Sequence, residues 1–528
     1  MKLKYLVLLS LIFLLSSCAT GHQALTDRIR SMVGSNQHDE AIQLITTGSL
    51  AQDRNSKLLY HVELGLVQHY KGDYEASIQA LTEAKVLLDE LFTTRVSGKI
   101  SSSIINDNSD FYYGEKYEAS LIYFYLSLNH YLRAQEEQDA VKKGTYLRQA
   151  RAEILAWDAF LSEIKKERLG KALFKEDLLA KTFGALVHES QKTKNDDQIA
   201  LQLYKDANDV FFKYYNLFPT FNNSYQVFKD NFSNFHKISE KEVAGKYVMA
   251  TPHSEEFKNF LTQKILMLTK KIRPQELKEQ IAKLKPSQEI LNRLNTPGGQ
   301  VTFLLQEGLI VGKGTQRYEF PVNWGNNRQM AGILALGSVI TFELPYIGTV
   351  PKPGSAKVQA LDQNGLIIAE APLSVIAPLG ELAKQAINEH TTAIATKTGI
   401  RLAAKHVAAL AVTYAAYQSN RKNNPEFAGA IAGLTHAAAV ALINESEKAD
   451  TRFWSTLPAN IRMSELTLKN GTYRFRAVYG QEGAGDYRIV DLGEKTIENK
   501  SLNFVMSGSN LKSPAKRDLA SVKDKKKN

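Results

Sequence analysis

The first half of the chain repeats apolar side chains at intervals of three and four residues. One such series runs from Leu121 to Leu132, and another runs from Leu203 to Phe218. This spacing places apolar side chains on one face of a helix, and proline is almost absent before Pro219. We therefore expect a helical domain over residues 18–295, in which helical hairpins stack on one another.

Residues 58–91 match a more specific helical pattern. Its characteristic positions are Leu64, Gly65, Tyr70, Gly72, Tyr74 and Ala84. Small residues allow two helices to approach closely, and the Gly72-Asp73 pair is typical of a tight turn. The segment resembles a tetratricopeptide repeat, although Ser77 stands where the repeat prefers alanine. Because a stable stack needs about three repeats, a generic helical bundle with one repeat-like hairpin is the alternative.

The pattern changes at Pro297-Gly298-Gly299, after which short β-type runs begin. These runs are 301–306, 318–322, 339–344, 357–360, 487–491 and 502–506. Such runs predict strands, whereas residues 379–447 are rich in alanine and predict helix. We expect an α+β multidomain chain, with a β-sandwich-like domain formed by 296–377 and 450–510 and a helical insertion at 378–449.

Three short motifs refine this picture. Asn364-Gly365 and Asn470-Gly471 each lie between two predicted strands, so both predict β-hairpins. Within the insertion, Gly429 and Gly433 form a GxxxG motif, which allows two helices to pack closely. We expect that packing between two soluble helices, with a membrane-touching or self-associating hairpin as the alternative.

The amino terminus has the pattern of a secretory signal. Lys2 and Lys4 precede an apolar run that ends at Leu15, and this run is too short to span a bilayer core of about 30 Å. The run leads into Leu15, Ser16, Ser17 and Cys18. These four residues resemble the lipobox of bacterial lipoproteins. We expect removal of residues 1–17 and acylation of Cys18, palmitate included; the alternative is an ordinary signal followed by an incidental cysteine.

Cys18 is the only cysteine among 528 residues, which excludes an internal disulfide framework and a cysteine-rich metal site. An acylated cysteine would hold the protein at a membrane. The lipoprotein resemblance implies the outer membrane, on its periplasmic face, because Ala19 is not the acidic residue that retains lipoproteins at the inner membrane. Uninterrupted apolar runs of about 18 residues are absent, which excludes a polytopic membrane protein.

Charge is distributed unevenly along the chain. The sequence has 66 basic and 55 acidic residues, a formal net charge of +11. Segment 511–528 holds seven basic and two acidic residues, so it alone contributes 7 − 2 = +5. Because the excess charge is concentrated in a tail, we expect no nucleic-acid partner. We expect the tail to be disordered and solvated, with contact to anionic lipid as the alternative.

The familiar catalytic motifs are absent from the sequence. It contains no HExxH, GxSxG, Walker or EF-hand pattern, so we expect a non-enzyme without a metal or cofactor. The remote alternative is a serine-type cell-wall enzyme of the penicillin-recognising kind. Its motifs would be Ser162 with Lys165, Tyr214 with Asn216, and Lys397-Thr398-Gly399. That chemistry needs a serine at a buried helix start, whereas Ser162 lies in a charged helix and Lys397 between predicted helical segments.

Two longer stretches carry a wider resemblance. Residues 450–460 read Asp-Thr-Arg-Phe-Trp-Ser-Thr-Leu-Pro-Ala-Asn, and residues 112–118 read Tyr-Tyr-Gly-Glu-Lys-Tyr-Glu. With the lipobox and the order of helices before strands, they resemble a family of uncharacterised proteobacterial lipoproteins with tetratricopeptide-like helices. The resemblance implies a periplasmic role near activators of peptidoglycan synthases, and it transfers no functional residue beyond the lipobox. From the residues themselves, we expect Trp454 to fill a helix–sheet junction and Asp450 to pair with Arg452 or cap the next turn.

These observations favour an adaptor lipoprotein of the cell envelope. Its helical repeats would present a concave face to another envelope protein, and a regulator of a cell-wall synthase is the concrete case. A glycan-binding lipoprotein is the runner-up, and it requires accessible aromatic side chains at Tyr112, Tyr113 or Phe221.

Overall fold

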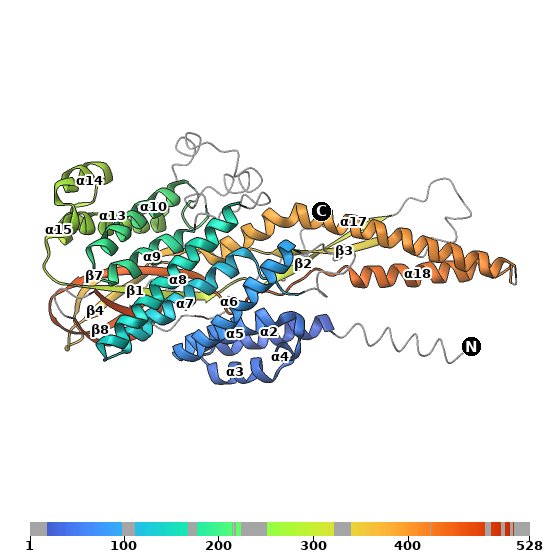
Figure 1. Cartoon of the computed structure of the whole chain (residues 1–528), viewed down its shortest axis with the longest axis horizontal. Coiled ribbons are helices and arrows are strands. Elements are labelled where there is room, and N and C mark those ends of the chain that lie inside the picture. The colour runs from blue at the N-terminus through green and yellow to red at the C-terminus, as the bar shows by residue number, and fades with distance from the viewer. Residues whose placement is uncertain are drawn as a thin grey trace.

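The computed structural model of the chain describes residues 18–97, 111–166, 177–213, 215, 218–222, 251–321, 339–422, 424–480, 487–497, 502–506 and 511. In these residues, a helical region precedes strands (Figure 1), which confirms the predicted α+β class. The signal segment 1–17 and the tail beyond Leu511 lie outside the described residues.

The helical region up to Asn295 consists of helices joined by turns. Its helices are α2 (Cys18–Gly34), α3 (His38–Thr47), α4 (Ser49–Gln52), α5 (Lys57–Lys71), α6 (Tyr74–Ser97), α7 (Lys116–Glu136), α8 (Ala140–Lys166), α9 (Leu178–Ser190), α10 (Lys194–Lys213), α13 (Pro252–Ile272), α14 (Leu277–Leu284) and α15 (Gln288–Asn295). Two short 3-10 helices, η1 (Arg54–Ser56) and η7 (Pro274–Glu276), precede α5 and α14.

Helices α5 and α6 form a close antiparallel hairpin, and two glycines allow it. Gly72 ends α5 with a φ of 89°, in the left-handed region that glycine adopts without strain. A Cβ atom at Gly65 would lie 2.7 Å from Cγ of Leu81 on α6. Glycine at this position therefore lets the two helix backbones approach.

Helix α7 lies in the interior of the helical region. A capping box between Glu115 and Glu118 begins it, which satisfies backbone donors at the helix start. Most of its side chains are buried, including the series from Leu121 to Leu132. Because this helix is buried around most of its circumference, its pattern is less amphipathic than that of a surface helix.

The strands form three sheets. They are β1 (Gly299–Leu309), β2 (Lys313–Pro321), β3 (Val339–Ile347), β4 (Ala356–Leu361), β5 (Ile367–Pro372), β6 (Ser374–Ala377), β7 (Pro458–Leu468), β8 (Gly471–Tyr479), β9 (Arg488–Ile497) and β10 (Leu502–Met506). The first sheet has the order β10-β1-β7-β6, the second has the order β5-β4-β8-β9, and β2 pairs with β3. Only β1 and β10 pair in parallel; the other described pairs are antiparallel.

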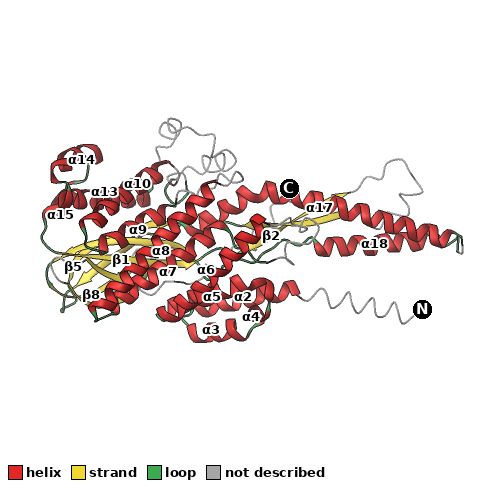
Figure 2. Cartoon of the chain, viewed as in Figure 1, coloured by secondary structure: helices red, strands yellow, loops and turns green. Residues whose placement is uncertain are grey.

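Strand β1 is buried on both faces and separates two apolar cores. Leu304 belongs to the large core that the helices share, whereas Phe303 and Leu305 belong to a second core with residues of β4 and β8. Alternate side chains of a strand point to opposite faces, so the first sheet lies between the helices and the second sheet. Figure 2 shows α7, α8 and α9 running beside β1, β5 and β8.

The two predicted hairpins have different outcomes. Strands β4 and β5 are antiparallel around Asn364-Gly365, which confirms the first. The hairpin predicted at Asn470-Gly471 is wrong, because β7 and β8 belong to different sheets. Leu468 on β7 and Phe475 on β8 both face the core between the sheets, so the chain crosses from one sheet to the other at this turn.

Two helices lie between β6 and β7, in the range where alanine-rich sequence predicted helix. They are α17 (Leu379–Arg421) and α18 (Ala428–Ser446), and they pack against each other. Arg401 and Lys405 of α17 bind the carboxylate of Glu447, with nitrogen–oxygen distances of 2.7 and 2.8 Å. Among the described residues, no helix is both long enough and apolar enough to cross a membrane.

Candidate functional site

The residues of the repeat-like motif form packing contacts in the interior. Leu64 packs against the large core and Ala84 is buried in it, while the Tyr70 hydroxyl donates to the Thr456 carbonyl over 2.9 Å. Ser77, which departs from the repeat pattern, donates its hydroxyl to the Gly65 carbonyl over 2.5 Å. The polar residue therefore links α6 to α5, where alanine would provide only van der Waals contact.

The described parts of the serine-enzyme motif do not have the arrangement that this chemistry needs. Ser162 is exposed near the end of α8 instead of buried at a helix start. Lys397-Thr398-Gly399 lies inside the continuous helix α17, so the prediction that it falls between helical segments is wrong. Tyr214 and Asn216 lie outside the described residues.

Segment 450–457 is held between the helices and the first sheet. The buried carboxylate of Glu63 on α5 accepts hydrogen bonds from the backbone amides of Ser455 and Thr456, over 2.6 and 3.3 Å. It also accepts a bond of 2.5 Å from the Thr456 hydroxyl. Burial raises the pKa of Glu63, and the hydrogen bonds from Ser455 and Thr456 oppose this shift. Arg30 of α2 donates to the carbonyls of Ser455 and Ile310.

Trp454 fills the junction at the centre of this segment, as expected. Its side chain is fully buried, and its ring centroid lies 5.8 Å from that of Tyr125 on α7. Its backbone amide donates to Glu118 over 2.8 Å. The expected pairing of Asp450 with Arg452 is also confirmed, at 2.8 Å. We interpret segment 450–457 as structural, because its described polar contacts join elements of the same chain.

A buried polar network continues from this junction. The Nδ1 atom of His69 lies 2.6 Å from Oδ1 of Asn129, and its Nε2 atom lies 2.9 Å from Nε2 of Gln306 on β1. The Tyr125 hydroxyl donates to Gln306 Oε1 over 2.7 Å. Burial lowers the pKa of His69 to about 4, so the ring is neutral near pH 7. A neutral ring with its proton on Nδ1 donates to Asn129 and accepts from Gln306.

A second buried network joins α9, α13 and β7. The ammonium group of Lys264 lies 2.7 Å from Glu189 and 2.6 Å from Glu465. All three side chains are at least nine-tenths buried. The two carboxylates raise the pKa of Lys264 against the opposite effect of burial. The lysine is therefore charged, and it ties two helices to the first sheet.

An open pocket lies beside this network, and it is the candidate binding site. Its volume is about 280 Å³, and α13, α15, β5, β6 and β7 contribute its walls. Its charged lining residues are Glu255, Glu256, Glu289, Arg293 and Glu465. Lys264 pairs with Glu465, and Arg293 pairs with Glu289 over 2.5 Å. Glu255 and Glu256 are the lining carboxylates that these two cations do not pair. The volume lies slightly below the range of about 300–1,000 Å³ for small-molecule sites, so the pocket fits one side chain or a small ligand.

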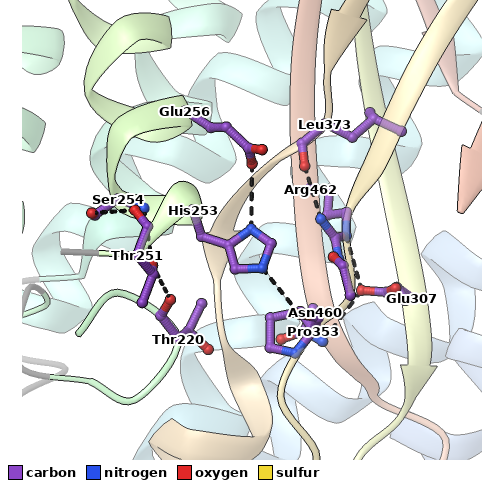
Figure 3. Close-up of polar contacts among 11 residues, drawn as sticks. Thr220, Thr251, His253, Ser254, Glu256, Glu307, Pro353, Leu373, Asn460 and Arg462 are labelled. Atoms are coloured by element: carbon purple, nitrogen blue, oxygen red, sulfur yellow. Dashed lines mark hydrogen bonds and ion pairs between the residues drawn. The ribbon is translucent and has the colours of Figure 1, made fainter. Parts of the chain in front are cut away.

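The first turn of α13 forms one wall of the pocket and is fixed by polar contacts (Figure 3). Thr251 caps the helix by accepting from the amide of Ser254, and it donates to the Thr220 carbonyl over 2.6 Å. His253 lies 3.3 Å from a carboxylate oxygen of Glu256 and 3.0 Å from the Pro353 carbonyl. Glu256 is thereby held at the edge of the pocket.

Arg462 fixes the strands on the opposite side of this region (Figure 3). It is fully buried on β7 and donates to the carbonyls of Leu373 and Gly354, over 2.9 and 2.7 Å. Its third contact is an ion pair of 2.9 Å with Glu307 on β1. These bonds hold the chain from β5 to β6 against β7, and so position the strand wall of the pocket.

Sequence patterns did not indicate the pocket, because its residues come from segments that are remote along the chain. The described residues contain no group of three or more His, Cys, Asp or Glu side chains that would hold a metal ion. Of the three aromatic residues that a glycan site was expected to use, Tyr112 and Phe221 are buried and Tyr113 is partly exposed. Comparison of the chain with models of protein families, with curated proteins and with solved structures finds no match.

Proposed function

We propose that this protein is an outer-membrane lipoprotein, anchored through Cys18, that acts as an adaptor for another protein of the cell envelope. The lipobox residues Leu15, Ser16 and Ser17 support the anchor, and Ala19 supports the outer membrane over the inner one. The role is non-enzymatic, in cell-envelope biogenesis, and a cell-wall synthase is the partner to test first.

The open pocket between α13, α15 and the first sheet is the observation that carries this proposal. Its lining has four carboxylates and one guanidinium, and Lys264 pairs with one of these carboxylates. The remaining excess of negative charge favours a cationic group, and the pocket volume suits one basic side chain of a partner. Parts of α5 and α7 face segment 450–457 and β1, so we place the partner at the pocket instead of on those helices. Helices α13 and α15, which line the pocket, lie toward the end of the molecule away from the start of α2 (Figure 1), and this would direct the pocket away from the membrane.

We infer two finer features of the fold as part of this proposal. Helices α5 and α6 would form one tetratricopeptide-like unit, supported by the close approach at Gly65 and the turn at Gly72. The two four-stranded sheets would form a sandwich-like domain, supported by the apolar core that they share. The alternative for the helices is a generic bundle with one such hairpin.

Photocrosslinking in cells tests the adaptor role. A photoreactive amino acid at Glu255 or Glu289, on the pocket rim, is expected to capture one recurrent protein, whereas the same residue at Val141 on α8 captures none. Capture at all three positions alike would contradict the pocket as the partner site. If neither rim position crosslinks to a protein and the chain is retained on purified cell wall, the adaptor role is rejected and a glycan-binding lipoprotein is favoured.

A further inference from the structure

The α17–α18 hairpin exposes large apolar side chains along both of its helices. They are Val407, Val412, Tyr414, Phe427, Leu434 and Leu442, and each is more than half exposed. Figure 1 shows the distal part of the hairpin extending past the rest of the chain at one end. Apolar side chains of this size gathered on one projecting element mark an interaction surface.

The distal part of the hairpin also lacks charge along both helices. Residues 406–420 of α17 contain no Asp, Glu, Lys or Arg, and neither do residues 427–444, which include most of α18. An exposed face of a helix normally carries charged residues opposite its apolar stripe. Here Ala409, Ile443 and the buried His436 face inward and hold the two helices together. The exposed apolar side chains are therefore not required for packing within the hairpin.

Charged side chains return at the tip of the hairpin. Arg421 and Lys422 are exposed there, and Glu426 is the one acidic residue between them and α18. A cationic tip beside an uncharged apolar face matches the phosphate and acyl-chain layers of a lipid surface. A protein partner would not require this order of charge along the element.

The position of the hairpin agrees with a lipid contact. Along the longest axis of the molecule, the two four-stranded sheets lie toward one end and the hairpin projects from the other (Figure 1). Helix α2 starts, at Cys18, on the side that faces the hairpin end. This step rests on the proposed function: if Cys18 is acylated, the hairpin projects toward the same membrane.

We propose that the α17–α18 hairpin lies against the lipid bilayer through its exposed apolar face, with Arg421 and Lys422 at the phosphate groups. The acylated Cys18 alone would tether the protein without fixing its orientation. A second contact at the hairpin would fix how the molecule is oriented at the membrane.

A vesicle experiment without acylation tests the hairpin by itself. Residues 18–528 with Cys18→Ser contain no other cysteine, so Leu434→Cys introduces one site for a polarity-sensitive fluorophore. Vesicles of phosphatidylethanolamine and phosphatidylglycerol are expected to shift its emission to the blue, and a lipid-borne quencher is expected to reduce it. The matched label at Val141→Cys, which is also exposed, should show neither effect. An unchanged emission at Leu434→Cys overturns the proposal.

A second copy of the chain is the alternative partner for these apolar side chains. A blue shift that appears without vesicles and grows with protein concentration would assign the face to a second copy of the chain, and would also overturn the proposal. Val407→Glu with Leu434→Glu is expected to weaken vesicle binding at least about tenfold, and Val141→Glu should leave it unchanged. Because these side chains are exposed, all three substitutions should preserve the circular dichroism spectrum.

Different results would reject the proposed lipid anchor and the proposed hairpin contact. Absence of lipid on Cys18 in cells, with vesicle binding intact, would reject the anchor and retain the hairpin contact. Acylated protein whose hairpin label stays in water at the membrane would reject the hairpin contact and retain the anchor.

Discussion

Replacing Lys264 with methionine tests how the helical region is joined to the first sheet. Lys264 contacts Glu189 on α9 at 2.7 Å and Glu465 on β7 at 2.6 Å, and all three groups are buried. Lys264→Met keeps much of the side-chain volume but leaves two buried carboxylates facing each other. Removing one partner of a buried ionic group costs roughly 3–5 kcal/mol. We therefore expect a loss of that size in the free energy of unfolding.

The same variant should acquire a characteristic pH dependence. Burial already raises the pKa of Glu189, and Lys264 lowers it, so losing the lysine raises this pKa further. A carboxyl group whose pKa is higher in the folded state binds more protons there, and stability falls as pH rises above the unfolded value of about 4.3. The variant should thus be more stable near pH 5 than near pH 8.

Denaturant unfolding followed by circular dichroism measures both effects. Lys271→Met is the matched control on the same helix, because Lys271 pairs with Asp197 at 2.8 Å but its side chain is 55% exposed; it should cost less than about 1 kcal/mol. Adding Glu465→Gln to Lys264→Met should restore part of the lost stability. The reasoning is refuted if the two lysine variants lose the same stability, or if Lys264→Met is equally stable at both pH values.

Three further predictions concern the interior. Trp454→Ala should lower the unfolding free energy by roughly 3–5 kcal/mol, because the indole is fully buried at the helix–sheet junction; a loss below about 1 kcal/mol in denaturant unfolding would contradict that role. Gly65→Ala should destabilise the chain, since its Cβ would lie 2.7 Å from Leu81 Cγ, whereas Gly399→Ala in α17 meets nothing within 4 Å and should raise the melting temperature slightly. Burial lowers the pKa of His69 to about 4, so the folded state disfavours the protonated imidazole ring. Stability should fall as pH drops from about 6.5 toward 4, by roughly 3 kcal/mol for this group, and His69→Gln should show a smaller fall in acid titration.

The interior residues show which contacts could be predicted from the sequence and which could not. Trp454 was predicted at a junction because a large aromatic in a mainly polar segment needs a place to pack. Glu63 was not predicted to bind that segment, since an acidic residue on an amphipathic helix is expected at the surface. Its burial is stabilised by donors nearly 400 residues away, and no local pattern carries that information.

The pocket residues show the same limit. Glu255 has the pattern of an ordinary acidic residue in the first turn of a helix, where its charge interacts favourably with the helix dipole, and Glu256 follows it directly. Their place beside Arg293 and Ser374 depends on how α13 packs between α15 and the strands. The sequence therefore indicated the elements that surround the pocket but not the pocket itself.

The sequence alone determined the class and local form of the elements. Periodicity of three to four residues specified the helices, alternation specified the strands, and glycines at 65 and 72 specified the close α5–α6 hairpin, because each depends on neighbouring residues only. The tertiary structure decided which buried faces of the helices and strands pack against each other. Alternation shows that Leu468 and Phe475 are buried, but not that they face each other across two sheets. The helical state of Lys397-Thr398-Gly399 within α17 and the pairing of Lys264 with two carboxylates were decided in the same way, because packing and buried charge depend on partners that are distant in the chain.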